Sequence, residues 1–172
     1  YKKAYYTFEK AGFSIKAVNF DHYGMNIEDL KNSGADVAYI MPSHQFPTGI
    51  VMPIGRRMEL LNWASNKEGR YLIEDDYDSE FRYKGKPIPA LQASDCNGRV
   101  IYIGTFSKSI APAIRVSFMV LPKGLLPRYE ELCGFLACTV SRIDQRILNA
   151  FVGEGHYERY ERFTQRRTPH VR

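Results

Sequence analysis

Hydrophobic and polar positions change their spacing from one segment to the next, which predicts alternating strands and helices. Short apolar runs typical of strands occupy residues 14–20, 36–42, 71–77, 100–104 and 115–122. Helical spacing is found at residues 1–13, after the candidate N-cap Asn26, and from Pro53 with Ile54, Met58, Leu61 and Ala64 along one face. Residues 125 to about 167 predict further helices, with breaks at Gly134 and around Gly153 and Gly155.

This alternation predicts an α/β protein, a three-layer sandwich with a mainly parallel sheet covered by helices on both faces. In such sheets the ligand crevice lies beyond the carboxyl ends of the strands. Polar residues at the ends of the apolar runs are therefore the first candidates for a functional site.

Composition limits the class of protein without naming a function. The 172 residues, with 44% apolar and 25% charged side chains, suit one soluble domain, and no apolar run approaches the ~20 residues of a membrane span. A net charge of +5 permits a phosphate-bearing ligand or nucleic acid without favouring either. Cys96, Cys133 and Cys138 lack metal-type spacing, so reduced thiols and a cytoplasmic location are expected.

The strand-like stretch "LIEDDYDSEF" carries an unusual set of polar residues. Strand alternation places Asp75 and Tyr77 on one face and Glu74, Asp76 and Asp78 on the other. A carboxylate beside a phenol can hold a nitrogen heterocycle, because the acid pairs with a protonated ring nitrogen and the phenol donates to a ring oxygen. Asp75 and Tyr77 are therefore candidate ligand-binding residues.

Two other interpretations of the same acidic stretch remain open. Asp76, Asp78 and Glu80 could supply oxygen ligands to a divalent cation. The stretch could also be a solvated acidic turn without a ligand.

The stretch "GTFSKSIAPAIR" ends an apolar run with a glycine and then presents Lys108. It lacks the second glycine of a GxxxxGK[ST] loop, so the sequence does not predict a phosphate-binding loop of that type. The interpretation of Lys108 as a surface lysine without a ligand stays open. A partly desolvated lysine at a strand end has a lowered pKa and can form a Schiff base with an aldehyde. Thr105, Ser107 and Arg115 would then supply hydroxyls and a planar guanidinium for a phosphate.

Together these residues offer an imine-forming amine, an acid for a ring nitrogen, a phenol and a phosphate clamp. Pyridoxal 5′-phosphate needs all of these groups. The residue set therefore predicts this cofactor and no metal.

Longer motifs strengthen this prediction. The stretches "YIMPSHQFPTGIVMP", "LIEDDYDSEFRY", "GTFSKSIAPAIRVSFMVLP" and "CTVSRIDQRILNAFVGEGHYERYERF" resemble the fold-type I pyridoxal-phosphate proteins, the aspartate-aminotransferase superfamily. They are more closely similar to the aminotransferase-like effector domain of MocR regulators in the GntR superfamily. The resemblance spans essentially the whole chain.

The resemblance implies a role for each residue that holds the cofactor ring. Lys108 would carry pyridoxal phosphate as an internal aldimine, and Asp75 would keep the pyridine nitrogen protonated, which makes the ring an electron sink. Tyr77 would donate a hydrogen bond to the phenolic oxygen of the ring.

The same resemblance implies a phosphate site and a further loop contact. Arg115 would bind the phosphate, helped by Thr105 or Ser107. His44 would lie near the oxygen edge of the cofactor, although a structural capping role for it is equally compatible with the sequence.

The resemblance also implies a longer parent protein. Residues 1–172 are expected to form part of the large cofactor-binding domain, an incomplete one, with residues from about 150 to 172 leading toward a small domain. The winged-helix DNA-binding domain of such regulators is not identifiable in this chain.

Three functions follow from these observations. The first is an effector-sensing domain of a transcriptional regulator that binds an amino acid or amine, forms a homodimer, contacts no membrane, and reaches DNA only through an N-terminal domain of the parent. The second is an aminotransferase (EC 2.6.1.-) in which Lys108 also moves a proton. The third is a metal-dependent phosphotransfer site at Asp76, Asp78 and Glu80. The His-Gln-Phe-Pro loop around His44 favours the first.

Overall fold

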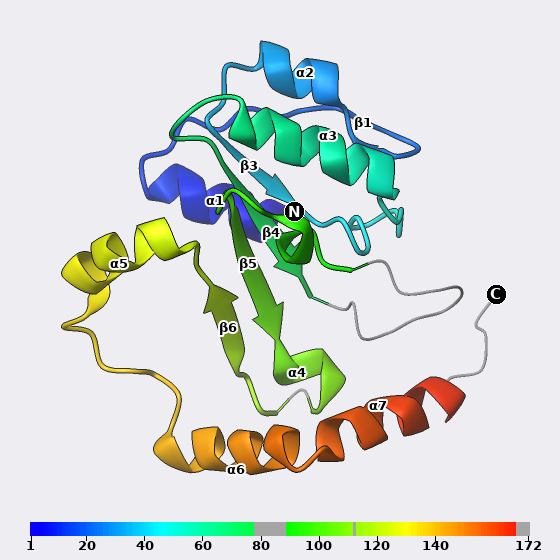
Figure 1. The fold of residues 1–172 in the computed structure, drawn as a ribbon, viewed down its shortest axis with the longest axis vertical. Coiled ribbons are helices and arrows are strands. Elements are labelled where there is room, and N and C mark those ends of the chain that lie inside the picture. The colour runs from blue at the N-terminus through cyan, green and yellow to red at the C-terminus, as the bar shows by residue number, and fades with distance from the viewer. Residues whose placement is uncertain (78–88, 112, 168–172) are drawn as a thin grey trace.

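The computed structural model describes residues 1–77, 89–111 and 113–167, and within these it leaves out the side chains of residues 108, 109, 161, 162 and 164–167. Its main sheet has the order β3-β4-β5-β6 (Figure 1). The strands are β3 (Val37–Ile40), β4 (Tyr71–Asp76), β5 (Val100–Thr105) and β6 (Ser117–Val120). The first three run parallel and β6 runs antiparallel to β5, so the prediction of a mainly parallel sheet is confirmed.

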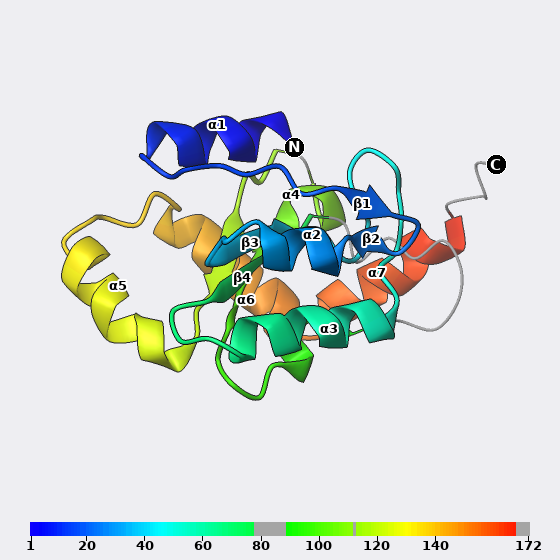
Figure 2. The same cartoon turned by 90° about the horizontal axis from the view of Figure 1, so that it is seen from above.

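Helices cover both faces of this sheet, as the alternating pattern predicts. The elements before β4 are α1 (Lys2–Lys10), β1 (Phe20–Asp21), β2 (Gly24–Met25), α2 (Ile27–Asn32) and α3 (Ile54–Ser65). Seen from above, α1 lies on one side of the sheet and α3 on the other (Figure 2). Phe8 of α1 contacts Tyr39 of β3 with ring centroids 6.1 Å apart, whereas the buried core joins Leu60 and Ala64 of α3 to Leu72 of β4.

The strand expected at residues 14–20 is wrong. Only Phe20 of that segment is in a strand, the two-residue β1, which pairs with β2 outside the main sheet. Of its apolar residues only Ile15 and Val18 are partly buried, a spacing of three positions rather than two. An extended strand face needs alternation, so this segment crosses the surface without joining the sheet.

The helices after Asn26 and Pro53 are confirmed, with one difference in the buried face. The Asn26 side chain accepts a hydrogen bond from the backbone N–H of Asp29, as expected of an N-cap. In α3, Leu61 and Ala64 are buried as predicted, but Ile54 is 54% exposed. Arg57, one helical turn later, is buried in the inward-facing stripe.

The remaining elements connect the last three strands or come after β6. They are η1 (Gln92–Ser94), α4 (Phe106–Ser109), η2 (Lys123–Leu125), α5 (Leu126–Cys133), α6 (Arg142–Gly153) and α7 (His156–Arg167). Figure 1 shows α6 and α7 lying across the end of the sheet where α4 is found. The predicted helix breaks are confirmed, and the first extends from Gly134 to Ser141. Within the part of the chain that the structure describes, no helix combines the length and apolar character that a bilayer crossing requires.

Candidate functional site

The candidate residues gather at the carboxyl edge of the three parallel strands. In the register of β4 and β5, Asp75 lies beside Ile103 and Asp76 beside Gly104. Helix α4, which contains the backbone of Lys108, begins directly after β5. Segments separated in the sequence are therefore brought to one edge of the sheet, as the strand order predicts.

The acids of β4 are divided between the two faces as predicted. Asp75 is partly exposed, on the face that α1 covers, and it is followed by partly exposed Tyr77. Glu74 and Asp76 point to the α3 face and are 0% and 3% exposed. Among the described acids of β4, the one whose carboxylate is partly accessible to a ligand lies on the first face.

Tyr39 contacts Asp75 on the accessible face. Its phenol donates a short hydrogen bond to the Asp75 carboxylate from the neighbouring strand β3. Burial, followed by this hydrogen bond, raises the pKa of Tyr39, so the phenol keeps its proton and remains a donor. Sequence reasoning missed Tyr39; the available signal was a single phenol inside an otherwise aliphatic strand.

Tyr77 joins β4 to the β3–α3 loop, which comprises residues 41–53. Its phenol donates to the backbone carbonyl of His44 over 3.0 Å. The contact uses the His44 main chain, so the predicted contact of the His44 side chain with a cofactor stays a prediction. The two ends of this loop are joined by a hydrogen bond from the Met52 N–H to the Pro42 carbonyl, over 2.9 Å.

Both buried acids of β4 have specific hydrogen-bond donors. The Glu74 carboxylate accepts from the backbone N–H groups of Leu91 (2.7 Å) and Gln92 (2.9 Å), and burial raises the pKa of Glu74. Asp76 accepts from the Tyr102 phenol of β5 over 2.8 Å. Its second oxygen, Oδ1, is buried with no hydrogen-bond partner among the described residues.

Arg57 is the cation that faces these acids. It is 1% exposed, and its guanidinium donates to the carbonyls of Met52 (3.0 Å), Pro89 (2.8 Å) and Pro42 (2.9 Å). Burial lowers the pKa of Arg57, whereas the negative charges of Glu74 and Asp76 favour its charged form. Sequence reasoning missed this residue, although a charged side chain between Ile54 and Leu61 on an apolar helical stripe was a usable signal.

The turn from β5 into α4 contains the hydroxyls expected to help bind phosphate. Thr105 is the N-cap of α4: its Oγ1 accepts from the Ser107 N–H and donates to the Val116 carbonyl, both over 3.2 Å. The two hydroxyl residues are partly buried. The side chain of Lys108 lies outside what the structure describes, so its predicted bond to a cofactor is not tested by the geometry.

Close packing against β6 explains why a glycine, Gly104, stands at the end of this apolar run. A Cβ at Gly104 would lie 2.4 Å from Cζ of Phe118, which is opposite it on the antiparallel strand β6. The Phe118 ring also packs on Phe106 of α4, with centroids 5.2 Å apart. Gly104 therefore lets β6 fix the first residue of the helix that carries Lys108.

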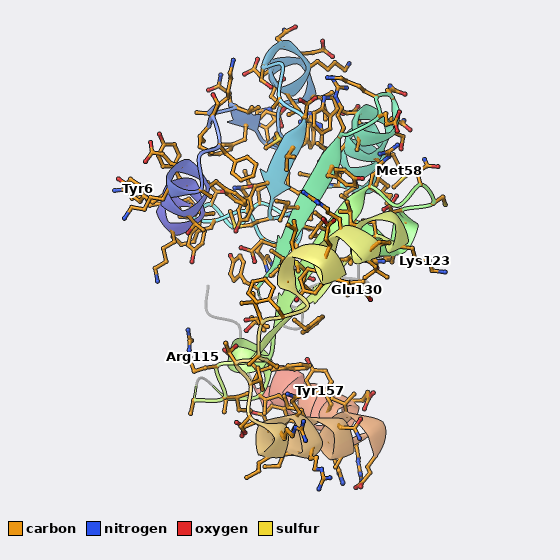
Figure 3. All side chains as sticks on the ribbon, turned by 90° about the vertical axis from the view of Figure 1, so that its left-hand side faces the viewer. Tyr6, Met58, Arg115, Lys123, Glu130 and Tyr157 are labelled. Atoms are coloured by element: carbon orange, nitrogen blue, oxygen red, sulfur yellow. The ribbon has the colours of Figure 1, made fainter. Side chains whose placement is uncertain are left out.

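Arg115 lies in the turn between α4 and β6. Its φ of 51° is in the left-handed region, which is uncommon for a residue other than glycine, and its side chain is exposed. Figure 3 shows Arg115 near α4, projecting toward the side of the sheet that α1 occupies. This is the face of Asp75, so the placement is compatible with the predicted phosphate contact without testing it.

The metal alternative involves residues that are only partly described. Asp76 is buried and bonded to Tyr102, while Asp78 and Glu80 lie outside the described residues. Among the side chains that the structure does describe, no three His, Cys, Asp or Glu residues come together as metal ligands.

Known proteins similar to this chain are of two kinds, regulators and aminotransferases. The HTH-type transcriptional regulator YdeL of Bacillus subtilis is 41% identical over 93% of this chain and 34% of its own length. The probable rhizopine catabolism regulatory protein MocR of Rhizobium meliloti is 33% identical over 91% of this chain and 31% of its own length. No family model matches the chain.

The fold is that of the aminotransferases. The crystal structure of Pyrococcus horikoshii kynurenine aminotransferase, in complex with PMP, superposes with a TM-score of 0.76 at 32% identity, over 87% of this chain and 39% of that one. The chain thus spans about a third of the length of the regulators and about two-fifths of the enzyme. The resemblance to MocR-type regulators and the fold class, an incomplete aminotransferase-like large domain, are both confirmed.

Proposed function

We propose that this chain, which is homologous to MocR-type regulators, is the pyridoxal-phosphate-binding, effector-sensing part of a transcriptional regulator. The observation that carries the proposal is the arrangement at the carboxyl edge of the sheet. There Asp75 and Tyr77 lie at the carboxyl end of one strand, and the helix containing Lys108 follows the next. Regulators that are up to 42% identical to this chain support the regulatory half of the proposal.

The donor set at this edge fits pyridoxal phosphate. Asp75 offers a partly exposed carboxylate whose position is fixed by Tyr39, as a protonated ring nitrogen requires. Thr105 and Ser107 offer hydroxyls, and Arg115 a guanidinium, for the phosphate. When bound, the cofactor supplies an aldehyde that condenses with an amine and a ring that withdraws electrons.

Each residue of the chain then has a defined task. Lys108 holds the cofactor covalently and gives way to an incoming amine, and Asp75 keeps a proton on the ring nitrogen. The Tyr77 phenol has only one proton, which it gives to the His44 carbonyl here. Donation to an oxygen of the cofactor would free that carbonyl, so cofactor binding is coupled to the β3–α3 loop.

The parent protein would extend beyond these residues. We place residues 1–172 in part of the large domain, with the segment from about 150 to 172 leading to a small domain. DNA contact would come from an N-terminal winged helix of the parent, which would act as a cytoplasmic homodimer. An amino acid or amine would be the effector, and its exchange with Lys108 would shift the arrangement of domains.

An aminotransferase is the second candidate, since the matched kynurenine aminotransferase shares 32% of the aligned residues. The same side chains would serve, with Lys108 also moving a proton. The metal-dependent phosphotransfer alternative has less support, because buried Asp76 is already bonded to Tyr102.

One experiment separates these functions. The full-length protein is incubated with pyridoxal phosphate, and its visible spectrum, its DNA affinity and the turnover of an amino donor with a keto acid are measured. A sensor should bind the cofactor, change its spectrum and DNA affinity when an amine is added, and show no sustained turnover. Multiple turnovers at ordinary enzyme rates would favour the aminotransferase, and failure to retain the cofactor would refute both.

A further inference from the structure

Two loops next to the carboxyl end of β4 are fastened from the buried side of the sheet. The β3–α3 loop carries His44, and the connection from β4 to β5 contains Pro89, Leu91 and Gln92. Backbone groups of both loops point to charged side chains in the core. The β3–α3 loop also contacts the accessible face, because its His44 carbonyl accepts the hydrogen bond of Tyr77.

Arg57 bonds to both loops at once. Its Nε and Nη2 bind the Met52 and Pro42 carbonyls at the two ends of the β3–α3 loop, while Nη1 binds the Pro89 carbonyl of the other connection. A guanidinium can do this because its donors have fixed, divergent directions in one plane. A lysine ammonium at this position would be a single point charge unable to span three separated carbonyls.

Glu74 complements Arg57 from the strand. It fastens the connection at Leu91 and Gln92, next to Pro89, and it precedes Asp75 directly in β4. Its charge favours the charged form of Arg57 against the cost of burial. The two residues therefore form a buried clamp, defined as Arg57 and Glu74, that holds both loops relative to the strand that carries Asp75.

We infer that the Arg57–Glu74 clamp positions the cofactor site without touching the cofactor, an inference that rests on the proposed function. The clamp fixes the β3–α3 loop, and the loop places the His44 carbonyl. That carbonyl holds the Tyr77 phenol in position until the phenol donates to the cofactor instead. Arg57 is thus a positioning residue that acts through the main chain of the loop. Its loss should alter the site even where the sheet still forms.

The chain supplies a matched control in the adjacent residue. Arg56 also binds a backbone carbonyl, that of Met25, and pairs with Asp21, and these contacts hold the β1–β2 hairpin instead of the loops. Its other partner, Glu59, lies on the same helix. Arg56→Lys and Arg57→Lys both keep the positive charge, but each removes a different set of guanidinium hydrogen bonds. Arg56→Lys therefore controls for the loss of a guanidinium from this helix, and the affinity, spectral and exchange measurements separate positioning of the site from a general loss of stability.

The test compares wild type, Arg57→Lys and Arg56→Lys in the full-length protein, with Glu74→Gln as a second clamp variant if Arg57→Lys does not fold. Affinity for pyridoxal phosphate is measured by titration, the visible spectrum of the bound cofactor is followed against pH, and amide hydrogen exchange is measured without cofactor. For the clamp variants we expect about a fivefold loss of affinity, as for removal of the Tyr77 phenol through which the clamp acts, and a shifted spectral pH profile. We also expect faster exchange at the Met52 and Gln45 amides, which donate to the Pro42 and Ile50 carbonyls within the loop. Arg56→Lys should stay within twofold of wild-type affinity.

Equal losses in the Arg56 and Arg57 variants, or a clamp variant with wild-type affinity and exchange, would overturn the inference. If wild type itself binds no cofactor, the proposed function fails. In that case unchanged exchange in the clamp variant would also refute the positioning of the loops by Arg57, and faster exchange would support it.

Discussion

Both faces of β4 carry carboxylates, but the surroundings of these carboxylates differ from one face to the other. On the α1 face, Asp75 is partly exposed and is fixed by one phenol from the neighbouring strand. On the α3 face, Glu74 and Asp76 are buried, bonded to backbone amides or to Tyr102, and opposed by the charge of Arg57. Acidic residues one position apart can thus serve binding on one side of a strand and architecture on the other.

The largest effect should come from removing the buried cation. Arg57→Met leaves Glu74 and Asp76 in the core without a positive charge, so we expect the free energy of unfolding to fall by about 3–5 kcal/mol. Urea denaturation measures this change. Arg56→Met, at the more exposed neighbouring position, should cost clearly less. Equal losses would remove the distinction between the buried clamp and an ordinary surface contact.

A substitution on the accessible face should reduce cofactor affinity more than it reduces stability. Asp75→Asn still accepts the Tyr39 hydrogen bond but loses the charge that pairs with a protonated ring nitrogen. We expect about a tenfold to hundredfold loss of affinity for pyridoxal phosphate, from the ~1.5–3 kcal/mol of a charged hydrogen bond. The melting temperature without cofactor should change little.

The matched variant on the other face is Asp76→Asn. It should lower the melting temperature more than Asp75→Asn does and reduce cofactor affinity less. The reverse ranking in differential scanning calorimetry and cofactor titration would contradict the division of the two faces.

A smaller effect is expected from Tyr77→Phe. The substitution removes the bond to the His44 carbonyl and the proposed donor to the cofactor, worth about 1 kcal/mol, so affinity should fall about fivefold. Cofactor titration measures it, with exposed Tyr23→Phe in the β1–β2 hairpin region as control. Wild-type affinity in the Tyr77 variant would exclude a role for this phenol in binding.

The pH dependence of stability gives a finer test of the buried face. Burial raises the pKa of Glu74 above its ordinary 4.5, so the folded state holds this proton more tightly than the unfolded state and the contribution of Glu74 falls as pH rises. Arg57 opposes that rise, and without it the pKa of Glu74 should rise further. The stability difference between wild type and Arg57→Met should therefore widen from pH 4.5 to pH 7 in urea titrations. A difference independent of pH would show that the two charges are not coupled.

The sequence predicted the layers and the placement of candidate residues at the carboxyl edge of the sheet, because both depend on local periodicity and strand order. Strand alternation alone separates Asp75 from Glu74, and the order of strands brings residues 75–77 to the same edge as the helix of Lys108. Residues 14–20 were mistaken for a strand because apolar content was read without a partner strand. Arg57 and Tyr39 stand out locally as polar groups among apolar neighbours, but a local pattern does not encode their partners, carbonyls and a carboxylate distant in sequence.

The central claim is that the carboxyl edge of this sheet holds pyridoxal phosphate on Lys108. Borohydride reduction of the full-length protein incubated with the cofactor, followed by peptide mapping, tests it most directly. Lys123 is an internal control, because it follows β6 at the opposite edge of the sheet, well away from Arg115 (Figure 3). The account predicts the label on Lys108, with its loss in Lys108→Ala and no change in Lys123→Ala. A label on Lys123 or on any other lysine, or no stable label at all, would contradict it.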